Sequence, residues 1–465
     1  MFGAPSHGLG SLPNELLFEV LHDLPNDALC QLSLVSKKIC RVAQEVLHRS
    51  PELSVSQYWE EEKGTWMEDG RLANLLRTFI NRPDLAKVVQ RLTLSPIDRS
   101  VRDRSSMMRD IPPETAAVLG SSRINVTEPA IVGMILQIVP NLQELSLQAT
   151  ILDKSSYKHR YDEKKYTPDL ISDMFGDDTL VKWKDYFYDF ESAQIAGLAG
   201  LKKLRLATGE LHWSWCELPK LEVLHVDRVC RVELYDVPTT KTSDSILELI
   251  LERDTNFLFE GYESNQIRNL LSKFTSLTTL TLRISNYLVY CPYHHPSSRK
   301  EAFGFGSFLG GIAEEEQCDE FLSHLLDTAQ TLRHLEILVA EDEHEDGSFL
   351  QLLAPVASFQ LPRLTHLKVP SEMLIRCNSD YITKTEGVAK RLLPSTLTRL
   401  EITYPWMTTA DLLADLSRDR DLFAALEEVV IHGSSVRGNA NEQLFEQQPF
   451  WSELEGNGIN VAWKD

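Results

Sequence analysis

One apolar phrase, Leu-x-x-Leu-x-Leu with Val or Ile as substitutes, recurs ten times between residues 89 and 431. Its last two apolar residues stand two positions apart, so in an extended strand both side chains point to the same side. A strand phrase repeated along a chain is typical of a solenoid, in which each repeat covers the apolar face of the next. The ten copies are Val89/Leu92/Leu94, Leu142/Leu145/Leu147, Leu201/Leu204/Leu206, Leu221/Leu224/Val226, Ile246/Leu249/Leu251, Leu277/Leu280/Leu282, Leu332/Leu335/Ile337, Leu364/Leu367/Val369, Leu397/Leu400/Ile402 and Leu426/Val429/Ile431.

Segments with helical apolar spacing precede several of these strands. The middle residue of the phrase recurs every 20 to 33 residues over most of the chain, which leaves room for a short helix between two turns. Wider gaps follow Leu92, Leu145 and Leu280, and we expect insertions there. The helical segments are 131–138, 267–274, 321–326, 388–393 and 412–416.

The alternation of helices and strands predicts an α/β fold. We expect an irregular leucine-rich-repeat solenoid with a helix and a strand per repeat, and with a parallel sheet on its concave face. A doubly wound α/β enzyme would also alternate helices and strands. The strands here keep one phrase throughout, however, and no Gly-rich phosphate-binding loop follows any of them, which favours the solenoid.

The residue between the last two apolar positions of each copy points away from the core, onto the face that the sheet offers to a ligand. These ten positions are chemically mixed, which suits recognition of a particular protein surface. The alternative is a solvated sheet whose ligand contacts the loops. The candidate substrate-binding residues are Thr93, Ser146, Arg205, His225, Ile250, Thr281, Glu336, Lys368, Glu401 and Val430.

Two long insertions are alternative ligand sites. The stretch 157–190 is rich in aromatic residues, as interface anchors are, although it could equally be a helix packed on the array. The stretch 286–311 holds Cys291, His294 and His295, which invite a zinc interpretation. Closed zinc sites usually bring a second spaced pair of ligands, and because none is present we predict a loop without a metal.

Residues 12–43 predict three short helices. Pro13 stands at the beginning of the first helix, where its missing N–H would have no intrahelical partner. Pro25-Asn26-Asp27 ends that helix, the second spans 28–34, and the third begins at Ser36. So small a helical unit has little core of its own and is marginal unless something else covers its apolar surface.

The same residues resemble the F-box, the module by which substrate receptors join SCF-type ubiquitin ligases. Leu12-Pro13-x-Glu15-Leu16-Leu17 is similar to the opening of that family, and Val35-Ser36-Lys37-Lys38 is similar to its Val-Ser/Cys-Lys-Arg stretch. Ile39 is a departure, because the family usually has an aromatic residue there, most often Trp. A smaller side chain could weaken adaptor docking without abolishing it.

This resemblance implies a Skp-type adaptor as the direct partner, cullin and RING subunits as indirect partners, and a protein substrate. The alternative is that the three helices only cap the domain behind them. The residues expected to pack the helices and to present an apolar surface to the adaptor are Leu12, Pro13, Leu16, Leu17, Val20, Leu21, Leu29, Leu32, Val35 and Ile39.

A second resemblance covers residues 72–94. This stretch is similar to the opening of the repeat array in fungal F-box proteins with degenerate leucine-rich repeats. It runs from Leu72-Ala73-Asn74-Leu75-Leu76-Arg77 to Leu92-Thr93-Leu94. Such a family implies a receptor that presents a bound protein to a ubiquitin-conjugating enzyme and performs no chemistry itself.

Charge and hydropathy narrow the classes of partner. The formal net charge of −21 argues against a nucleic acid, whose phosphates need clustered Lys and Arg. No stretch approaches the length of an apolar membrane span, and the first residues do not resemble a signal peptide. The seven cysteines are scattered without a framework, which suits a reducing compartment. We therefore expect a cytoplasmic or nuclear protein with no membrane or nucleic-acid partner.

The sequence contains no recognisable catalytic motif. It has no nucleophile elbow, no Walker loop, no His-Glu-x-x-His helix and no spaced cysteine pair of the RING kind. We expect no enzymatic activity and no cofactor, with a zinc enzyme built on 286–311 as an alternative. A leucine-rich scaffold that binds a partner without any ligase is a further alternative.

These observations together predict a substrate-recognition subunit of an SCF-type E3 ubiquitin ligase. Its expected domains are an F-box domain over 1–55, a helical linker over 56–84 and a leucine-rich-repeat substrate-binding domain over 85–465.

Overall fold

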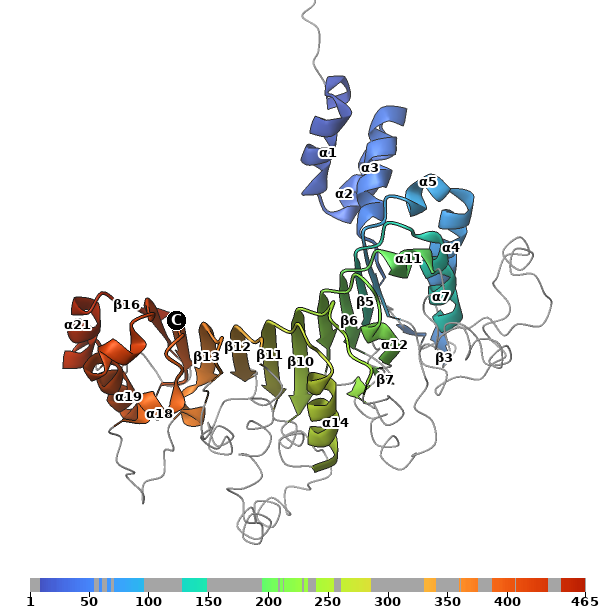
Figure 1. Cartoon of the computed structure of the whole chain (residues 1–465). Coiled ribbons are helices and arrows are strands. Elements are labelled where there is room, and N and C mark those ends of the chain that lie inside the picture. Colours follow the sequence, from blue (N-terminus) through green and yellow to red (C-terminus); the bar gives the residue numbers. More distant parts are fainter. Residues whose placement is uncertain are drawn as a thin grey trace, which may run out of the picture. The chain divides into compact units, whose positions relative to one another are not determined.

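The computed structural model divides into two compact units (Figure 1). The first unit comprises Met1–Leu224 with Val229–Arg231, and the second comprises His225–Arg228 with Val232–Asp465. The described residues are 9–53, 58–60, 65–67, 71–95, 128–148, 195–207, 210–211, 213–227, 230–232, 240–254, 261–285, 330–339, 359, 361–374, 387–405, 407–433 and 445–464.

Three helices open the first unit, after a short 3-10 turn, η1 (Leu9–Ser11). Pro13 and Pro25 immediately precede the first two helices with extended backbone, and the Ser36 hydroxyl caps the third by accepting a hydrogen bond from Ile39 N at 3.2 Å. Five buried apolar residues hold the helices together. The helices are α1 (Asn14–His22), α2 (Asn26–Leu32) and α3 (Lys37–Arg49), and the core residues are Leu17, Leu21, Leu29, Val42 and Ala43.

Parallel strands follow in the first unit, each paired with the next one along the sheet. The helices between them lie together on one side of the strands (Figure 1). Two short pairs, β2 (Tyr58–Glu60) with β3 (Thr65–Met67) and β7 (Glu210–Leu211) with β9 (Arg231–Val232), stand outside this sheet. The strands of the sheet are β1 (Glu52–Leu53), β4 (Arg91–Leu94), β5 (Glu144–Gln148), β6 (Lys203–Ala207) and β8 (Val223–Val226), the last two residues of which belong to the second unit. The helices are α4 (Arg71–Asn81), α5 (Pro83–Ala86), α7 (Glu128–Ile138), α11 (Ala196–Ala199) and α12 (Trp213–Cys216).

The second unit repeats this arrangement with seven described parallel strands in sequence order. The strands are β10 (Glu248–Asp254), β11 (Thr279–Ser285), β12 (His334–Val339), β13 (His366–Pro370), β14 (Arg399–Thr403), β15 (Glu428–His432) and β16 (Asn460–Lys464). The helices are α14 (Gly261–Ser272), α18 (Val388–Leu392), α19 (Met407–Arg418) and α21 (Pro449–Gly456), with 3-10 turns η7 (Ser371–Met373) and η8 (Arg420–Phe423). Each unit is therefore an α/β, solenoid-like arrangement of parallel strands.

All ten strands predicted from the apolar phrase are confirmed, and their anchor leucines are almost completely buried. Four of the five predicted helices are confirmed as α7, α14, α18 and α19, while 321–326 lies outside the described residues. Two strands of the sheets were not predicted. β1 has only two residues, and β16 carries Val461 and Trp463 in place of the leucine phrase.

A shared carbonyl fixes the start of most of the repeated strands. Thr278 N and Thr279 N both donate to Leu247 O, at 2.8 and 3.0 Å, and Arg333 N and His334 N both donate to Thr278 O. The same pair of bonds joins Gln143 and Glu144 to Gln90 O in the first unit, and Thr398 and Arg399 to Thr365 O in the second. This repeated pair sets the register of one strand on the next, so the leucines of successive repeats lie side by side.

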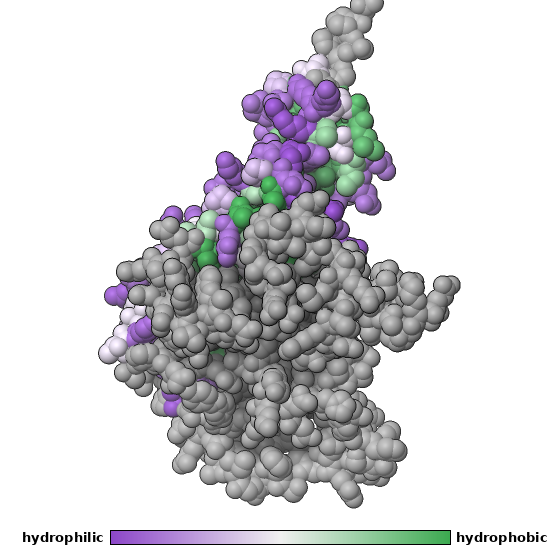
Figure 2. Space-filling view, turned by 90° about the vertical axis from the view of Figure 1, so that its right-hand side faces the viewer, coloured by the Kyte–Doolittle hydropathy of each residue, from purple (hydrophilic) through white to green (hydrophobic). Residues whose placement is uncertain are grey.

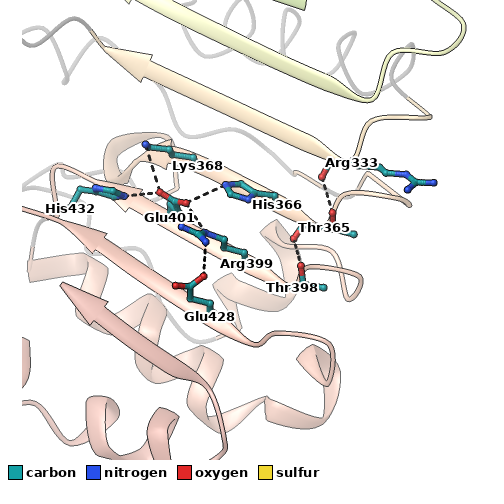
Figure 3. Close-up of polar contacts among 9 residues, drawn as sticks. All are labelled: Arg333, Thr365, His366, Lys368, Thr398, Arg399, Glu401, Glu428 and His432. Atoms are coloured by element: carbon teal, nitrogen blue, oxygen red, sulfur yellow. Dashed lines mark hydrogen bonds and ion pairs between the residues drawn. The ribbon is translucent and has the colours of Figure 1, made fainter. Parts of the chain in front are cut away.

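Threonine hydroxyls reinforce this junction in the second unit. Thr278 Oγ1 donates to Leu247 O at 3.0 Å, Thr365 Oγ1 to Arg333 O at 3.2 Å, and Thr398 Oγ1 to Thr365 O at 2.9 Å. The last two contacts form a short ladder beside β12 to β14 (Figure 3). Each of these three carbonyls thereby accepts hydrogen bonds from two backbone N–H groups and one hydroxyl. The polar groups at these strand starts therefore have hydrogen-bond partners.

The helical layer is held by close approaches and by a buried cap. A Cβ on Gly197 of α11 would lie 2.5 Å from Leu136 O of α7, so only glycine permits this contact. In the second unit, Val388 N at the start of α18 donates to Asp415 Oδ2 of α19 at 3.0 Å. This carboxylate, which is buried, satisfies one of the free N–H groups of the helix start. Within the described residues, no helix is both long enough and apolar enough to cross a membrane.

Candidate protein-interaction sites

The helices α1 to α3 leave several large apolar side chains exposed. Leu16 and Val20 on α1 are 46% and 47% exposed, and Leu34 and Val35 in the turn between α2 and α3 are 87% and 65% exposed. Figure 2 shows apolar surface gathered along one edge of this helical unit. Clustered exposed apolar residues on a small unit indicate a surface that a partner covers. We call Leu16, Val20, Leu34 and Val35 the apolar patch.

The ten residues predicted to serve the adaptor divide into two structural roles. The buried members pack the three helices, whereas the exposed members are available to a partner. Leu17, Leu21, Leu29 and Ile39 are buried, Leu12 and Leu32 are half-buried, and Pro13, Leu16, Val20 and Val35 are exposed. Lys38 Nζ also donates to Leu12 O, which ties α3 to the residue that begins the motif.

Sequence reasoning missed the most exposed residue of the apolar patch. The second helix was predicted over 28–34 but ends at Leu32, so Leu34 lies in the exposed turn before the third helix and not on a helix face. Its position directly before Val35 was the available signal. Ile39, by contrast, is only 4% exposed, so its side chain is packed in the interior and is not offered to a partner.

Nine of the ten candidate substrate residues, all but His225, form two rows in register, one in each unit. Thr93 pairs with Ser146 and Ser146 with Arg205 in the first unit. In the second unit the row runs Ile250, Thr281, Glu336, Lys368, Glu401, Val430 from β10 to β15. We call the side of β10 to β16 that carries this second row, opposite the anchor leucines, the outward face.

Not every member of the second row is accessible. Thr281 and Glu401 are 7% and 5% exposed, and Val430 is fully buried. Ile250, Glu336 and Lys368 are half-buried and keep part of their surface open. A partner on this face would therefore meet these three side chains and the residues that flank them on the same strands.

Glu401 is the centre of a polar cluster on the outward face (Figure 3). His432 Nε2 lies 2.7 Å from Glu401 Oε2, and Lys368 Nζ lies 3.6 Å from the same oxygen. On the other carboxylate oxygen, Arg399 Nε is 2.7 Å away and His366 Nε2 is 3.4 Å away. Arg399 also reaches Glu428 at 2.7 Å. We call these six residues the Glu401 cluster.

The cluster alters the ionisation of its central carboxylate. The polar contacts with His366 and His432 lower the pKa of Glu401 well below its ordinary 4.5, and burial, which acts in the opposite direction, is outweighed. The charges of Lys368 and Arg399 act in the same sense as the two histidines. Glu401 is consequently ionised over the whole physiological range. The pKa of the adjacent His334 is lowered, first by partial desolvation and then by His366.

A second, smaller ion-pair group joins His225 of β8 to residues of β10 and β11. His225 Nε2 and Arg283 Nη1 contact Glu252 Oε1 at 2.7 and 3.0 Å. The buried guanidinium of Arg253 donates to Asp227 O and Glu252 O, each at 2.8 Å. Of the predicted row, His225 is thus engaged by a neighbouring strand within the second unit.

Several predicted features lie outside the described residues. These are the aromatic stretch 157–190 and the stretch 286–311 with Cys291, His294 and His295. Among the residues that the structure does describe, no group of three or more His, Cys, Asp or Glu side chains is arranged to hold a metal ion. Two of the four described cysteines, Cys216 and Cys230, are buried, and burial raises the pKa of Cys216 above its ordinary value.

Comparison with known families identifies the helical unit. Residues 9–54 match the family model described as F-box-like, which spans η1, α1 to α3 and β1. A search of curated proteins finds no match for the chain. F-box domains generally bind Skp-type adaptors and typically belong to non-catalytic proteins. The chain therefore carries an F-box-like domain at residues 9–54, with the apolar patch on its surface.

Proposed function

We propose that this protein is the substrate-recognition subunit of an SCF-type E3 ubiquitin ligase. In this proposal the F-box-like domain docks on a Skp-type adaptor, which links it to cullin and RING subunits, and the strand array binds a protein substrate. The strands act as a leucine-rich-repeat solenoid, as the ten copies of the phrase predict. The receptor itself performs no chemistry.

The apolar patch is the observation that carries this proposal. Four large apolar side chains are exposed on a unit whose own core consists of five buried residues, so covering them gives a strong driving force for association. Full burial of each Leu or Val side chain is worth about 1.5 to 3 kcal/mol. Its position within the segment that matches the F-box-like family supports an adaptor as the protein that covers it.

The test is recovery of the adaptor with the wild type and with Leu34→Asp/Val35→Asp. Both side chains are mostly exposed, so the substitution leaves the helical core intact while it removes apolar contact and adds charge. We expect adaptor affinity to fall by at least about a hundredfold. Leu422→Asp, at a 42% exposed leucine of the second unit, is the matched control and should leave adaptor recovery unchanged.

Two results would argue against the proposal. Equal recovery of the adaptor with the wild type and Leu34→Asp/Val35→Asp would reject the patch as the docking surface. A wild-type protein that brings down no adaptor, cullin or RING subunit would favour the alternative of a leucine-rich scaffold outside any ligase. If the adaptor is recovered with the wild type, proteins that accumulate after deletion of the receptor would identify the substrate.

A further inference from the structure

Five exposed cations line the edge of the first unit at which the strands β4, β6 and β8 begin. Lys87 lies in the turn before β4 and Arg91 is the first residue of that strand. Lys202 and Lys203 stand at the start of β6, and Lys220 lies in the turn before β8. We call these five residues the basic edge. Its charge is opposite in sign to the formal net charge of the whole chain, which is −21.

The pairing of the strands holds these cations side by side. Arg91 and Lys203 pair in register with Glu144 of β5, one on each side of it. Lys202 O accepts a hydrogen bond from Glu222 N at 2.9 Å, which fixes the start of β8 beside that of β6. Neighbouring strands are about 4.8 Å apart, so the edge from β4 to β8 is about 14 Å long. An extended peptide of about five residues, at about 3.3 Å per residue, spans this length.

The acids beside the basic edge do not neutralise it. Glu144 Oε2 lies 3.2 Å from Arg91 Nε, and Glu144 Oε1 lies 3.4 Å from Lys203 Nζ, so two cations share one carboxylate. The other three cations make no ion pair within the described part of the chain. Glu217 and Glu222 are the remaining acids of this edge, which leaves five cations against three carboxylates. The basic edge therefore keeps an excess of two positive charges.

The residues that flank the edge on the side of α3 leave this excess in place. Arg82 is paired with Asp84 at 2.7 Å. Arg49, the last residue of α3, and Glu52 of β1 add one further charge of each sign. A positive excess on an exposed surface attracts a partner of negative charge and orients it during the encounter.

The basic edge and the apolar patch lie at opposite ends of α3. Leu34 and Val35 stand just before this helix, whereas Arg49 ends it and donates from Nε to Gln90 Oε1 at 2.9 Å, beside the start of β4. A helix of 13 residues is about 20 Å long, at about 1.5 Å per residue. The two surfaces are therefore separate parts of the first unit.

We propose that the basic edge docks a carboxylate-rich segment of the protein substrate. This inference rests on the proposed receptor function and adds the chemistry of the substrate to it. Charge complementarity argues for the acidic segment, and Glu144 already shows one carboxylate held between cations of two strands. Nucleic acid is disfavoured, because an excess of two charges neutralises few phosphates and the chain as a whole is strongly negative.

The test uses the full-length protein and a fluorescently labelled hexaglutamate peptide. We expect Lys202→Gln/Lys203→Gln to bind this peptide about tenfold more weakly than the wild type, since two exposed charge contacts are together worth about one factor of ten. Lys390→Gln/Arg391→Gln removes two adjacent exposed cations from α18 of the second unit and should leave the affinity unchanged. An uncharged hexaglutamine peptide should not bind to the wild type.

Glu144→Gln tests the charge in the opposite direction. It releases Arg91 and Lys203 from their shared carboxylate and raises the positive excess by one. Hexaglutamate should therefore bind about threefold more tightly to this variant than to the wild type. A gain in affinity cannot arise from unfolding, so this variant separates charge from fold, and circular dichroism checks the fold of the lysine variant.

Several outcomes would overturn the inference. They are no binding of hexaglutamate, equal binding of hexaglutamine, equal affinity of the wild type and the folded lysine variant, weaker binding by Glu144→Gln, or equally tight binding of a six-nucleotide oligothymidylate.

The adaptor provides a last control. Lys202→Gln/Lys203→Gln should recover the adaptor as the wild type does, and a loss of the adaptor would assign the basic edge to the adaptor interface and overturn the inference. The peptide experiment itself contains no adaptor, so its failure is distinguishable from failure of the receptor proposal.

Discussion

Glu401 shows how one side chain organises a surface. Its side chain is 7% exposed, and it is the one acceptor common to groups from three neighbouring strands, namely His366 and Lys368 from β13, Arg399 from β14 itself and His432 from β15. A buried carboxylate with this many partners is stabilised in its charged form. Removing its charge would leave two permanent cations without their shared counter-ion.

We predict that Glu401→Gln destabilises the second unit by about 2 kcal/mol at pH 7, the worth of charge-assisted hydrogen bonds. The folded-state pKa of Glu401 is lowered, so its stabilising contribution is fully present above pH 4.5 and is lost as the pH falls below that value. The difference between wild type and variant should therefore shrink by up to about 1.4 kcal/mol per pH unit below 4.5.

Hydrogen exchange of β14 amides measures this difference across the pH series. Glu427→Gln, at an exposed carboxylate just before β15, serves as the control and should have little effect at any pH. A Glu401→Gln penalty that stays constant down to pH 3.5 would show that the carboxylate contributes by packing rather than by charge.

Sequence reasoning found Glu401 and Lys368 but missed the rest of the cluster. The strand phrase singles out one middle position per repeat, whereas His366 and Arg399 stand two residues earlier and His432 two residues later on the same face. Strand alternation places residues two apart on one side, so the signal was present in the sequence. Which of those side chains would turn toward Glu401 depends on the register, which the sequence does not state directly.

At the scale of the element, the threonine hydroxyls at the strand starts provide a matched pair for mutation. We predict that Thr398→Val destabilises the second unit by about 1 kcal/mol, because it removes the 2.9 Å hydrogen bond to Thr365 O while it keeps the shape and strand preference of the side chain. Urea denaturation followed by hydrogen exchange at β14 measures the change.

Thr403→Val on the same strand is the control. In the described part of the chain, Thr403 Oγ1 is buried and has no hydrogen-bond partner, so its replacement by an apolar group should be neutral or stabilising. Equal losses of stability in both variants would show that the hydroxyl at the strand start contributes nothing specific.

The strands were predictable because their apolar pattern coincides with their hydrogen bonding. At each junction with a shared carbonyl, the second N–H donor directly precedes the middle leucine of the phrase, as at Leu145, Leu280 and Leu400. β1 and β16 escaped prediction because they terminate the array. A terminal strand pairs with one neighbouring strand and not with two, so selection for the full leucine phrase is weaker there.

At the scale of the whole molecule, the division into two compact units predicts that a destabilising substitution affects chiefly the unit that contains it. Leu145→Ala in the first unit and Leu400→Ala in the second each remove a buried anchor and should cost about 2 to 5 kcal/mol. Solenoid repeats interact mainly with their nearest neighbours. We therefore expect each variant to lose amide protection chiefly in its own unit, as hydrogen exchange with mass spectrometry would report.

A loss of protection in α1 to α3 upon Leu400→Ala equal to that in β13 to β15 would contradict this expectation. The domain boundaries predicted at residues 55 and 84 remain predictions. The stretch 56–84 contains the strand pair β2 and β3, the helix α4 and the start of α5. Within the expected F-box domain, β1 pairs with β4. This pairing could not be predicted, because a strand of two residues has no periodicity.

Because a shared carbonyl sets the register at the strand start, the segment between two strands can vary in length. β11 ends at Ser285 and β12 begins at His334, whereas β14 ends at Thr403 and β15 begins at Glu428, yet both junctions carry the same two N–H bonds. Descendants of such a chain can gain or shed intervening residues while the ladder of strands is preserved. New recognition loops can then be acquired in evolution without rebuilding the scaffold that carries them.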